Sequence, residues 1–280
     1  GIRHTQLNGS FTGYADLRRY NVIIMPSGYL EMSDYEISAL NDWVKQGGTL
    51  IAHNRSSRFI TSQDSLGSVK QLQDVLDQSK DYNFDLLREI YAVEDDLDQE
   101  SVLNNTLNLE ITYPWELNES NYSEEELKSR DKWQSIFMPS GSFVAGRTDQ
   151  KHWLTFGTPK TLPVLYGNYP VLMTSSNAEA PIRIGELIDN SKATEFRTIN
   201  WSTLPAGKDI KVRMSGLVWP EAAQRIANSA YLTRERVGKG QIILFAGEPN
   251  FRGSTRGTNR VWLNAVVYGP GLGTSPRIQL

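Results

Sequence analysis

The sequence contains no cysteine among its 280 residues. Disulfide bonds, cysteine metal ligands and cysteine nucleophiles are therefore all excluded for this chain. Because a chain without cysteine is indifferent to redox conditions, the same absence says nothing about the compartment in which the protein works.

Histidine is almost as scarce, with three residues, His4, His53 and His152. No two of them lie at close helical spacing, and the sequence has no His-x-x-Glu or His-Glu-x-x-His pattern of the kind that binds zinc. Isolated histidines more often pack or cap than bind metal. We therefore expect no metal site and no cofactor within this chain.

Strong net charge and long apolar runs are also missing. The chain carries 29 basic and 32 acidic residues, for a formal net charge of −3. Such a balance gives no broad field to attract nucleic acid or an anionic membrane. The longest apolar runs, such as 242–246, fall far below the ~18 residues of a membrane-spanning helix. We expect neither a nucleic-acid partner nor a membrane span.

The first clear pattern is a strand, a helix and a second strand. Residues 21–25 are apolar and end in a Pro-Ser-Gly turn. A capping box at Ser33–Glu36 opens a helix that the glycine pair 47–48 ends, and 49–52 form the next strand. This βαβ unit predicts parallel pairing with a right-handed crossover.

The middle of the chain is less regular. The spacing of its apolar residues predicts a helix over 63–87, whereas 81–121 are polar and irregular and indicate a surface excursion. We interpret 92–135 as an insertion within a single domain over 1–280. The acidic run 94–98 is interpreted as a solvated loop because it lacks the glycine of a calcium-binding loop. A second capping box at Ser123–Glu126 predicts a helix within the insertion.

The second half is predicted to be rich in β structure before a final helix. Short apolar segments separated by glycine, proline and asparagine run from 140 to 187. Pro220 suits the first turn of a helix. Gly238-Lys239 is flanked by the segments 231–237 and 240–246, which predicts a β-hairpin.

A polar loop follows the strand at 242–246 and leads into a helix with apolar residues from Val261 to Val267. Polar groups at the carboxyl end of a parallel strand lie where open α/β sheets place their sites. Two interpretations remain open. The arginines of the loop, with Arg260, either pair with Glu221, Glu235 or Glu248 in a structural network or form a pocket for a small carboxylate or sugar. The candidate ligand-binding residues are Glu248, Asn250, Arg252 and Arg256.

Two further motifs resemble catalytic or binding motifs but have structural interpretations. Gly253–Gly257 precedes a helix but lacks the spacing and the Gly-Lys-Ser/Thr end of a phosphate-binding loop, so it is interpreted as an irregular turn. Arg55-Ser56-Ser57 follows a strand without the glycines that a serine hydrolase elbow needs. The least favoured hypothesis is that the protein is a hydrolase with an unrecognised serine or aspartate nucleophile.

Two stretches resemble known proteins. Residues 20–28 with 40–52 resemble class I glutamine amidotransferase-like domains. Residues 245–253 with 259–265 are similar to the amidotransferase-like domain found C-terminal to the catalytic domain of some bacterial zinc carboxypeptidases. The resemblance implies an α/β fold with a mostly parallel, flavodoxin-like sheet flanked by helices, a helical insertion and some antiparallel β structure. It does not cover the insertion.

The resemblance also implies that the amidotransferase reaction is absent. Active members place a cysteine on a tight turn after one strand, and a histidine and a glutamate after a later strand. In this sequence the turn falls on His53-Asn54, the histidine position is Ala246, and only Glu248 matches. A carboxylate without its base and nucleophile cannot perform acyl transfer, so we expect a pseudoenzyme with no catalytic residue.

The same resemblance predicts the wider setting. Residues 1–6 look like the second strand of such a domain, which implies an N-terminal truncation and a zinc carboxypeptidase domain, with its zinc, upstream in the same polypeptide. The chain would then be an accessory domain of a periplasmic or secreted protein, able to stabilise the peptidase, to form a homodimer or to help position substrate.

Overall fold

The structure is a computed structural model that describes residues 4–7, 16–28, 31–94 and 122–274. One large sheet runs through it in the order β1–β2–β14–β13–β7–β4–β12, with β5 beside β4 and with β6 joining β3 to β13. The strands of this path are β1 (Val22–Met25), β2 (Thr49–His53), β14 (Gly240–Phe245), β13 (Ala230–Val237), β7 (Ala178–Ile184), β4 (Ser142–Thr148) and β12 (Arg213–Ser215).

The α/β prediction is confirmed in its coarse form, as a large mixed sheet flanked by helices. The expectation of a mostly parallel sheet is wrong for the described strands. Only β1–β2 and β2–β14 pair in parallel, and every other described pairing is antiparallel. Short connections between strands explain the antiparallel pairing. Parallel neighbours need a long crossover connection, whereas β13 and β14 are joined by a two-residue turn.

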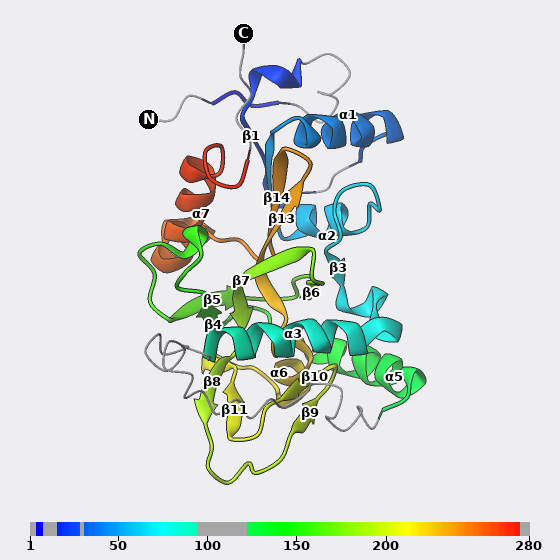
Figure 1. Ribbon diagram of the computed structural model, residues 1–280, viewed down its shortest axis with the longest axis vertical. Helices are drawn as coiled ribbons and strands as arrows, with labels where there is room; N and C mark the ends of the chain where they lie inside the picture. The colour runs from blue at the N-terminus through cyan, green and yellow to red at the C-terminus, as the bar shows by residue number, and fades with distance from the viewer. Residues whose placement is uncertain (1–3, 8–15, 29–30, 95–121, 275–280) are drawn as a thin grey trace, which may run out of the picture.

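The parallel end of the sheet carries helices on both sides. Figure 1 shows α1 (Asp34–Lys45) and α2 (Arg55–Thr61) to one side of β14 and α7 (Arg256–Tyr268) to the other. Both bonds of the predicted capping box hold the start of α1. A turn through Gly47, with φ 117°, ends this helix, because a glycine accepts that angle without strain.

Burial explains why the middle of the chain departs from the predicted helix over 63–87. Its apolar residues Val69, Leu72, Val75 and Leu76 are all buried. The spacing of these residues therefore indicated which positions are buried, but it did not indicate one continuous helix. The backbone instead forms β3 (Lys70–Gln71), two short 3₁₀ turns and then α3 (Ser79–Glu94).

Residues 81–94 are helical, which confirms the helix predicted up to residue 87 and contradicts the irregular structure predicted from residue 81 onward. They belong to α3, and Tyr82, Leu86, Leu87 and Ile90 give that helix a buried face. The helix predicted after the second capping box is confirmed as α5 (Glu124–Gln134), with both bonds of the box present. The rest of the predicted insertion, 95–121, lies outside the described residues.

The hairpin β13–β14 and the helices α6 (Pro220–Ile226) and α7 confirm the predictions for the last quarter. Val261 and Ala265 of α7 are buried as expected, whereas Leu263 and Val267 are exposed. The remaining strands are β5 (Thr161–Tyr166), β6 (Leu172–Met173), β8 (Glu186–Asp189), β9 (Arg197–Ile199), β10 (Ser202–Leu204) and β11 (Lys208–Lys211). Within the described parts of the chain, no helix has the length and apolar character to cross a bilayer.

Candidate functional site

The carboxyl ends of β2 and β14 lie side by side, as the predicted site requires. The two strands pair in parallel with Phe245 opposite His53, and the Asn54 amide donates a 3.0 Å hydrogen bond to the Phe245 carbonyl. The structure therefore brings the His53-Asn54 turn next to Ala246 and the loop that follows it. Residues 192 positions apart in sequence meet at one edge of the sheet.

Asn54 occupies a strained turn between a strand and a helix. Its backbone angles are φ 47° and ψ −107°, outside the regions that residues other than glycine favour. It precedes α2 at the capping position, yet its side chain makes no capping hydrogen bond. A sharp strand-to-helix turn of this kind exposes the nucleophile in enzymes that use a nucleophile elbow. Here an asparagine occupies that turn.

His53 is buried and neutral. Its ring is 5 % exposed and accepts a hydrogen bond at Nε2 from the Trp262 indole N–H, 3.0 Å away. The ring also meets the Phe245 ring edge-on, with centroids 5.4 Å apart. Burial lowers the pKa of His53 to about 4. A ring whose Nε2 lone pair is already engaged and which resists protonation is poorly suited to act as a general base.

The two serines after this turn have structural partners. The Ser56 hydroxyl donates to the Pro26 carbonyl at 2.5 Å, and the Ser57 hydroxyl donates to the Phe245 carbonyl at 2.8 Å. Both side chains are fully buried. They therefore tie α2 to the ends of β1 and β14, which agrees with the structural interpretation of this motif.

Ala246 and Glu248 lie just beyond β14. Ala246 is buried, and its amide donates to the Tyr231 carbonyl at 2.8 Å. Glu248 is half-buried and close to two tyrosines: burial raises the pKa of Tyr169, and the Glu248 charge raises it further. Among the described residues, Glu248 has no hydrogen bond or ion pair. The Tyr231 hydroxyl, fully buried, has no hydrogen-bond partner among them either.

The arginines of the loop do not form the predicted network within the described structure. Arg252, Arg256 and Arg260 are exposed, and no ion pair to a described residue involves them. The Arg252 guanidinium lies 5.1 Å from the centre of the Phe251 ring. Glu235 accepts hydrogen bonds from the Ser68 amide instead, at 2.7 and 3.0 Å. The charges that were expected to neutralise one another therefore stay apart.

Main-chain anchoring holds this loop in place. The hydroxyls of Thr255 and Thr258 both donate to the Pro249 carbonyl, at 2.8 and 2.5 Å. Arg252 has a φ of 51°, in the left-handed region, and Asn250 is exposed. The loop thus presents Asn250 and Arg252 to solvent from a fixed base.

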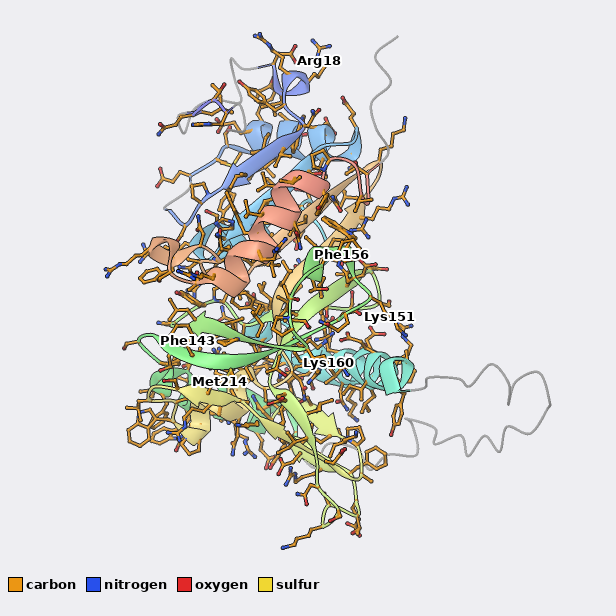
Figure 2. The ribbon with its side chains drawn as sticks, turned by 90° about the vertical axis from the view of Figure 1, so that its left-hand side faces the viewer. Arg18, Phe143, Lys151, Phe156, Lys160 and Met214 are labelled. Atoms are coloured by element: carbon orange, nitrogen blue, oxygen red, sulfur yellow. The ribbon has the colours of Figure 1, made fainter. Side chains whose placement is uncertain are left out.

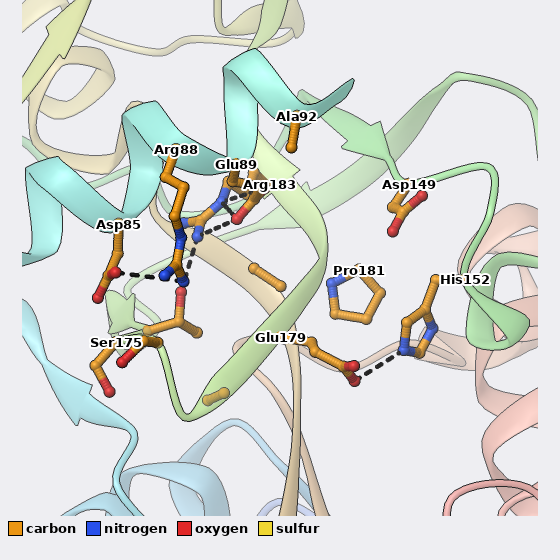
Figure 3. A pocket seen from close by; sticks show the side chains of 14 residues that line it. Asp85, Arg88, Glu89, Ala92, Asp149, His152, Ser175, Glu179, Pro181 and Arg183 are labelled. Carbon is orange, nitrogen blue, oxygen red and sulfur yellow. Dashed lines mark hydrogen bonds and ion pairs between the residues drawn. The ribbon is translucent and has the colours of Figure 1, made fainter. Parts of the chain in front are cut away.

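Two hollows lie elsewhere, along α3, and sequence reasoning missed both. Figure 3 shows the first, of about 390 Å³, between α3, the start of β7 and the turn at 149–152. Its charges are paired: Arg183 makes a bidentate contact with Glu89, and His152 Nε2 lies 3.2 Å from Glu179. No local motif marks these residues, because Arg183 and Glu89 are 94 positions apart.

The second hollow, of about 770 Å³, continues the first and shares Asp85, Ser175 and Ser176 with it. It is lined by hydroxyls and carboxylates, with Lys70 ion-paired to Asp64 at 2.7 Å. Neither hollow contains any of the predicted site residues. Across the described ranges no group of three or more histidine, aspartate or glutamate side chains is placed to hold a metal ion.

The comparisons with known proteins identify no family for this chain. No known protein family matches the sequence, and no curated protein matches it. One solved structure, "Cytoplasmic Protein STM3548 from Salmonella typhimurium", is similar with a TM-score of 0.38 and 11% sequence identity. That similarity covers 90% of this chain and 73% of the other. At such a TM-score the similarity carries no argument about function.

Proposed function

We propose that this chain is a non-catalytic, amidotransferase-like accessory domain of a zinc carboxypeptidase-like protein. The observation that carries the proposal is the strained turn at Asn54. It has the strand–turn–helix form that presents a nucleophile, but it holds an amide, and Ala246 is the neighbouring residue where a base is needed. A catalytic scaffold without its reactive groups is what a pseudoenzyme retains.

The surrounding side chains support the same conclusion. His53, the one histidine at this edge, is buried and hydrogen-bonded to Trp262, and the nearby serine hydroxyls are bound to carbonyls. Glu248 is the single residue that matches the catalytic pattern of the amidotransferases that the sequence resembles. We propose that the parallel end of the sheet derives from a flavodoxin-like amidotransferase fold and that the protein is periplasmic or secreted.

Zinc would belong to the peptidase domain rather than to this one. The described residues offer no ligand group for a metal, so we assign no step of any reaction to a metal in this chain. The reading frame upstream of Gly1 tests the parentage directly. A His-x-x-Glu pattern with a later histidine is expected there, and a frame without it would show that the assignment to a carboxypeptidase is wrong.

Activity measurements test the loss of catalysis. Purified protein incubated with glutamine is expected to release no ammonia above a buffer blank. Glu248→Ala and Asn54→Ala should leave that result unchanged, and a heat-unfolded sample serves as the control for spontaneous deamidation. Ammonia release that depends on Glu248 would refute the proposal.

A second candidate function, binding of a small carboxylate or sugar, rests on the exposed arginines. Arg252 and Arg256 lack ion pairs among the described residues, so their charge is free for an anionic ligand. Calorimetric titration with citrate and with glucuronate, as representative ligands, tests this function. Binding lost in Arg252→Ala but kept in Arg213→Ala would support it, and no heat with either ligand would count against it.

A further inference from the structure

A cluster of apolar side chains, all exposed except the half-buried Phe137, lies far from the strand ends discussed above. It consists of Trp133, Ile136, Phe137, Leu217 and Trp219, named here the aromatic patch. The Phe137 ring meets Trp133 at 5.2 Å and Trp219 at 6.3 Å between centroids, so the rings form one group. Trp133 is 59% exposed, Ile136 72% and Leu217 63%.

The aromatic patch is held rigidly. Trp133 belongs to α5, which a buried ion pair joins to α6: Arg225 Nε lies 2.8 Å from Asp131 Oδ1, with both side chains 8% exposed. Trp219 directly precedes α6. Both tryptophans are therefore presented by packed helices. Exposed tryptophans on a fixed surface are typical anchors of protein interfaces.

The area of the patch is comparable to that of the largest apolar patch on a typical monomer. With whole residues of roughly 150–250 Å², the exposed fractions sum to about 500 Å². The largest apolar patch of a typical monomer is about 300–600 Å² and is often functional. A standard interface buries about 800 Å² on each partner. The patch alone would supply more than half of one side.

An open strand edge borders the patch. All three residues of β12, Arg213 to Ser215, are exposed, and β4 is the only described strand that pairs with it. Met214 is 43% exposed and Phe143, on β4, is 39% exposed. An edge strand has main-chain groups that can hydrogen-bond to a strand from another chain.

We propose that β12 and the aromatic patch form the interface of a twofold-symmetric homodimer. Antiparallel pairing of β12 with its copy is self-complementary, as a twofold interface requires. It would extend the sheet across two molecules and bury each patch against the other. Met214, at the centre of a three-residue strand, would lie next to the axis.

The position of this surface favours a second copy over a domain joined upstream. Figure 2 places Arg18 of η2 (Leu17–Arg19) at one end of the molecule and Phe143 and Met214 well away from it, below the middle of the molecule. An N-terminal domain would be attached near η2, which leaves the patch free. The inference therefore stands whether or not the proposed accessory function is correct.

Sedimentation velocity between about 1 and 100 μM tests the dimer, a range that brackets affinities of a few micromolar. Wild-type protein is expected to shift from monomer to dimer across this range. Trp133→Ser and Trp219→Ser should each weaken dimerisation at least about tenfold. Phe156→Ser is the matched control, since Phe156 is 49% exposed, like Trp219, but lies apart from Met214 and Phe143 in Figure 2.

Charged substitutions at Met214, next to the proposed twofold axis, test the dimer even if a tryptophan variant unfolds. Met214→Lys and Met214→Glu should each be monomeric, because like charges would meet at the axis, and mixing the two should restore a dimer. Hydrogen exchange at 213–219 should slow at high concentration. A wild-type chain that stays monomeric at 100 μM, or a dimer that neither charge variant weakens, would overturn the proposal.

Discussion

The two ends of the sheet stabilise their buried polar groups in different ways. At the parallel end, His53, Ser56, Ser57 and Gln241 are uncharged and satisfied by neutral hydrogen bonds. The antiparallel end also has buried neutral hydrogen bonds, such as that from Asn228 to Ser202, but it adds ion pairs, of which Arg225–Asp131 is the most buried among the described residues. Losing one partner of a buried neutral hydrogen bond costs about 1–3 kcal/mol, whereas breaking a buried ion pair costs about 3–5 kcal/mol because a charge is left without water. Four predictions probe this contrast.

The largest effect is expected at the buried ion pair of the antiparallel end. Arg225→Ala should lower the free energy of unfolding by about 3–5 kcal/mol, because it leaves the Asp131 carboxylate buried without a partner. Urea unfolding followed by circular dichroism measures this loss. Lys128→Ala removes the exposed pair with Glu124 and should cost less than about 1 kcal/mol. Equal losses in the free energy of unfolding for the two variants would contradict the prediction that the buried ion pair contributes more than the exposed one.

Close main-chain packing at the parallel end gives the next effect. A Cβ at Gly240 would lie 2.0 Å from the Val44 carbonyl oxygen, so Gly240→Ala should destabilise the protein by about 3 kcal/mol. Gly253→Ala is the control, since nothing lies within 4 Å of its Cβ and only its φ of 67° opposes alanine. That variant should lose about 1 kcal/mol. The same urea assay compares them.

The pH dependence of stability isolates His53. The unfolded imidazole binds a proton as the pH falls through 6.5, whereas the folded one does so near 4. The stability due to neutral His53 is therefore complete above pH 6.5 and is lost as the pH falls toward 4. The loss should reach roughly 2–3 kcal/mol. Thermal melts at several pH values measure it.

The control for this titration is His53→Gln, which offers an acceptor to the Trp262 N–H but does not titrate. Its stability should change less than that of the wild type between pH 6.5 and 4.5, above the range in which most carboxylates take up protons. Parallel curves for the two proteins would mean that His53 is not buried as neutral imidazole.

Backbone strain at the parallel end gives the smallest effect. Asn54→Gly should stabilise the protein by about 1 kcal/mol, because glycine tolerates φ 47° and the asparagine side chain makes no capping bond. Asn228 has a similar φ of 63°, but its side chain is buried and hydrogen-bonds Ser202. Asn228→Gly should therefore destabilise. Melting temperatures that move in the same direction in both variants would contradict this distinction.

Local signals predicted much of the fold. The capping boxes at Ser33 and Ser123 and the turn at Gly238 each act within a few residues, and all three features are present. The apolar spacing over 63–87 predicted the first part of α3 correctly but was wrong before Ser79, because buried turns and a helix leave the same pattern of hydrophobic residues.

The location of the candidate site could be predicted from the sequence, but the contacts of its side chains could not. The sequence indicated that His53 and Glu248 follow neighbouring strands, and β2 and β14 are adjacent. It could not show that His53 binds Trp262 or that the loop arginines remain unpaired. The hollows along α3 and the aromatic patch are formed by residues that are distant in sequence, so no local sequence motif predicts them.

The position of β14 between β2 and β13 has a consequence for biosynthesis. All five residues of β2 are buried in the folded protein, and its partner β14 begins 187 residues after β2 ends. During translation one edge of β2 stays open until most of the chain has left the ribosome. Sheets closed by such distant strands fold slowly and are prone to aggregate while they wait. Chaperone dependence during expression would follow from this single feature of the topology.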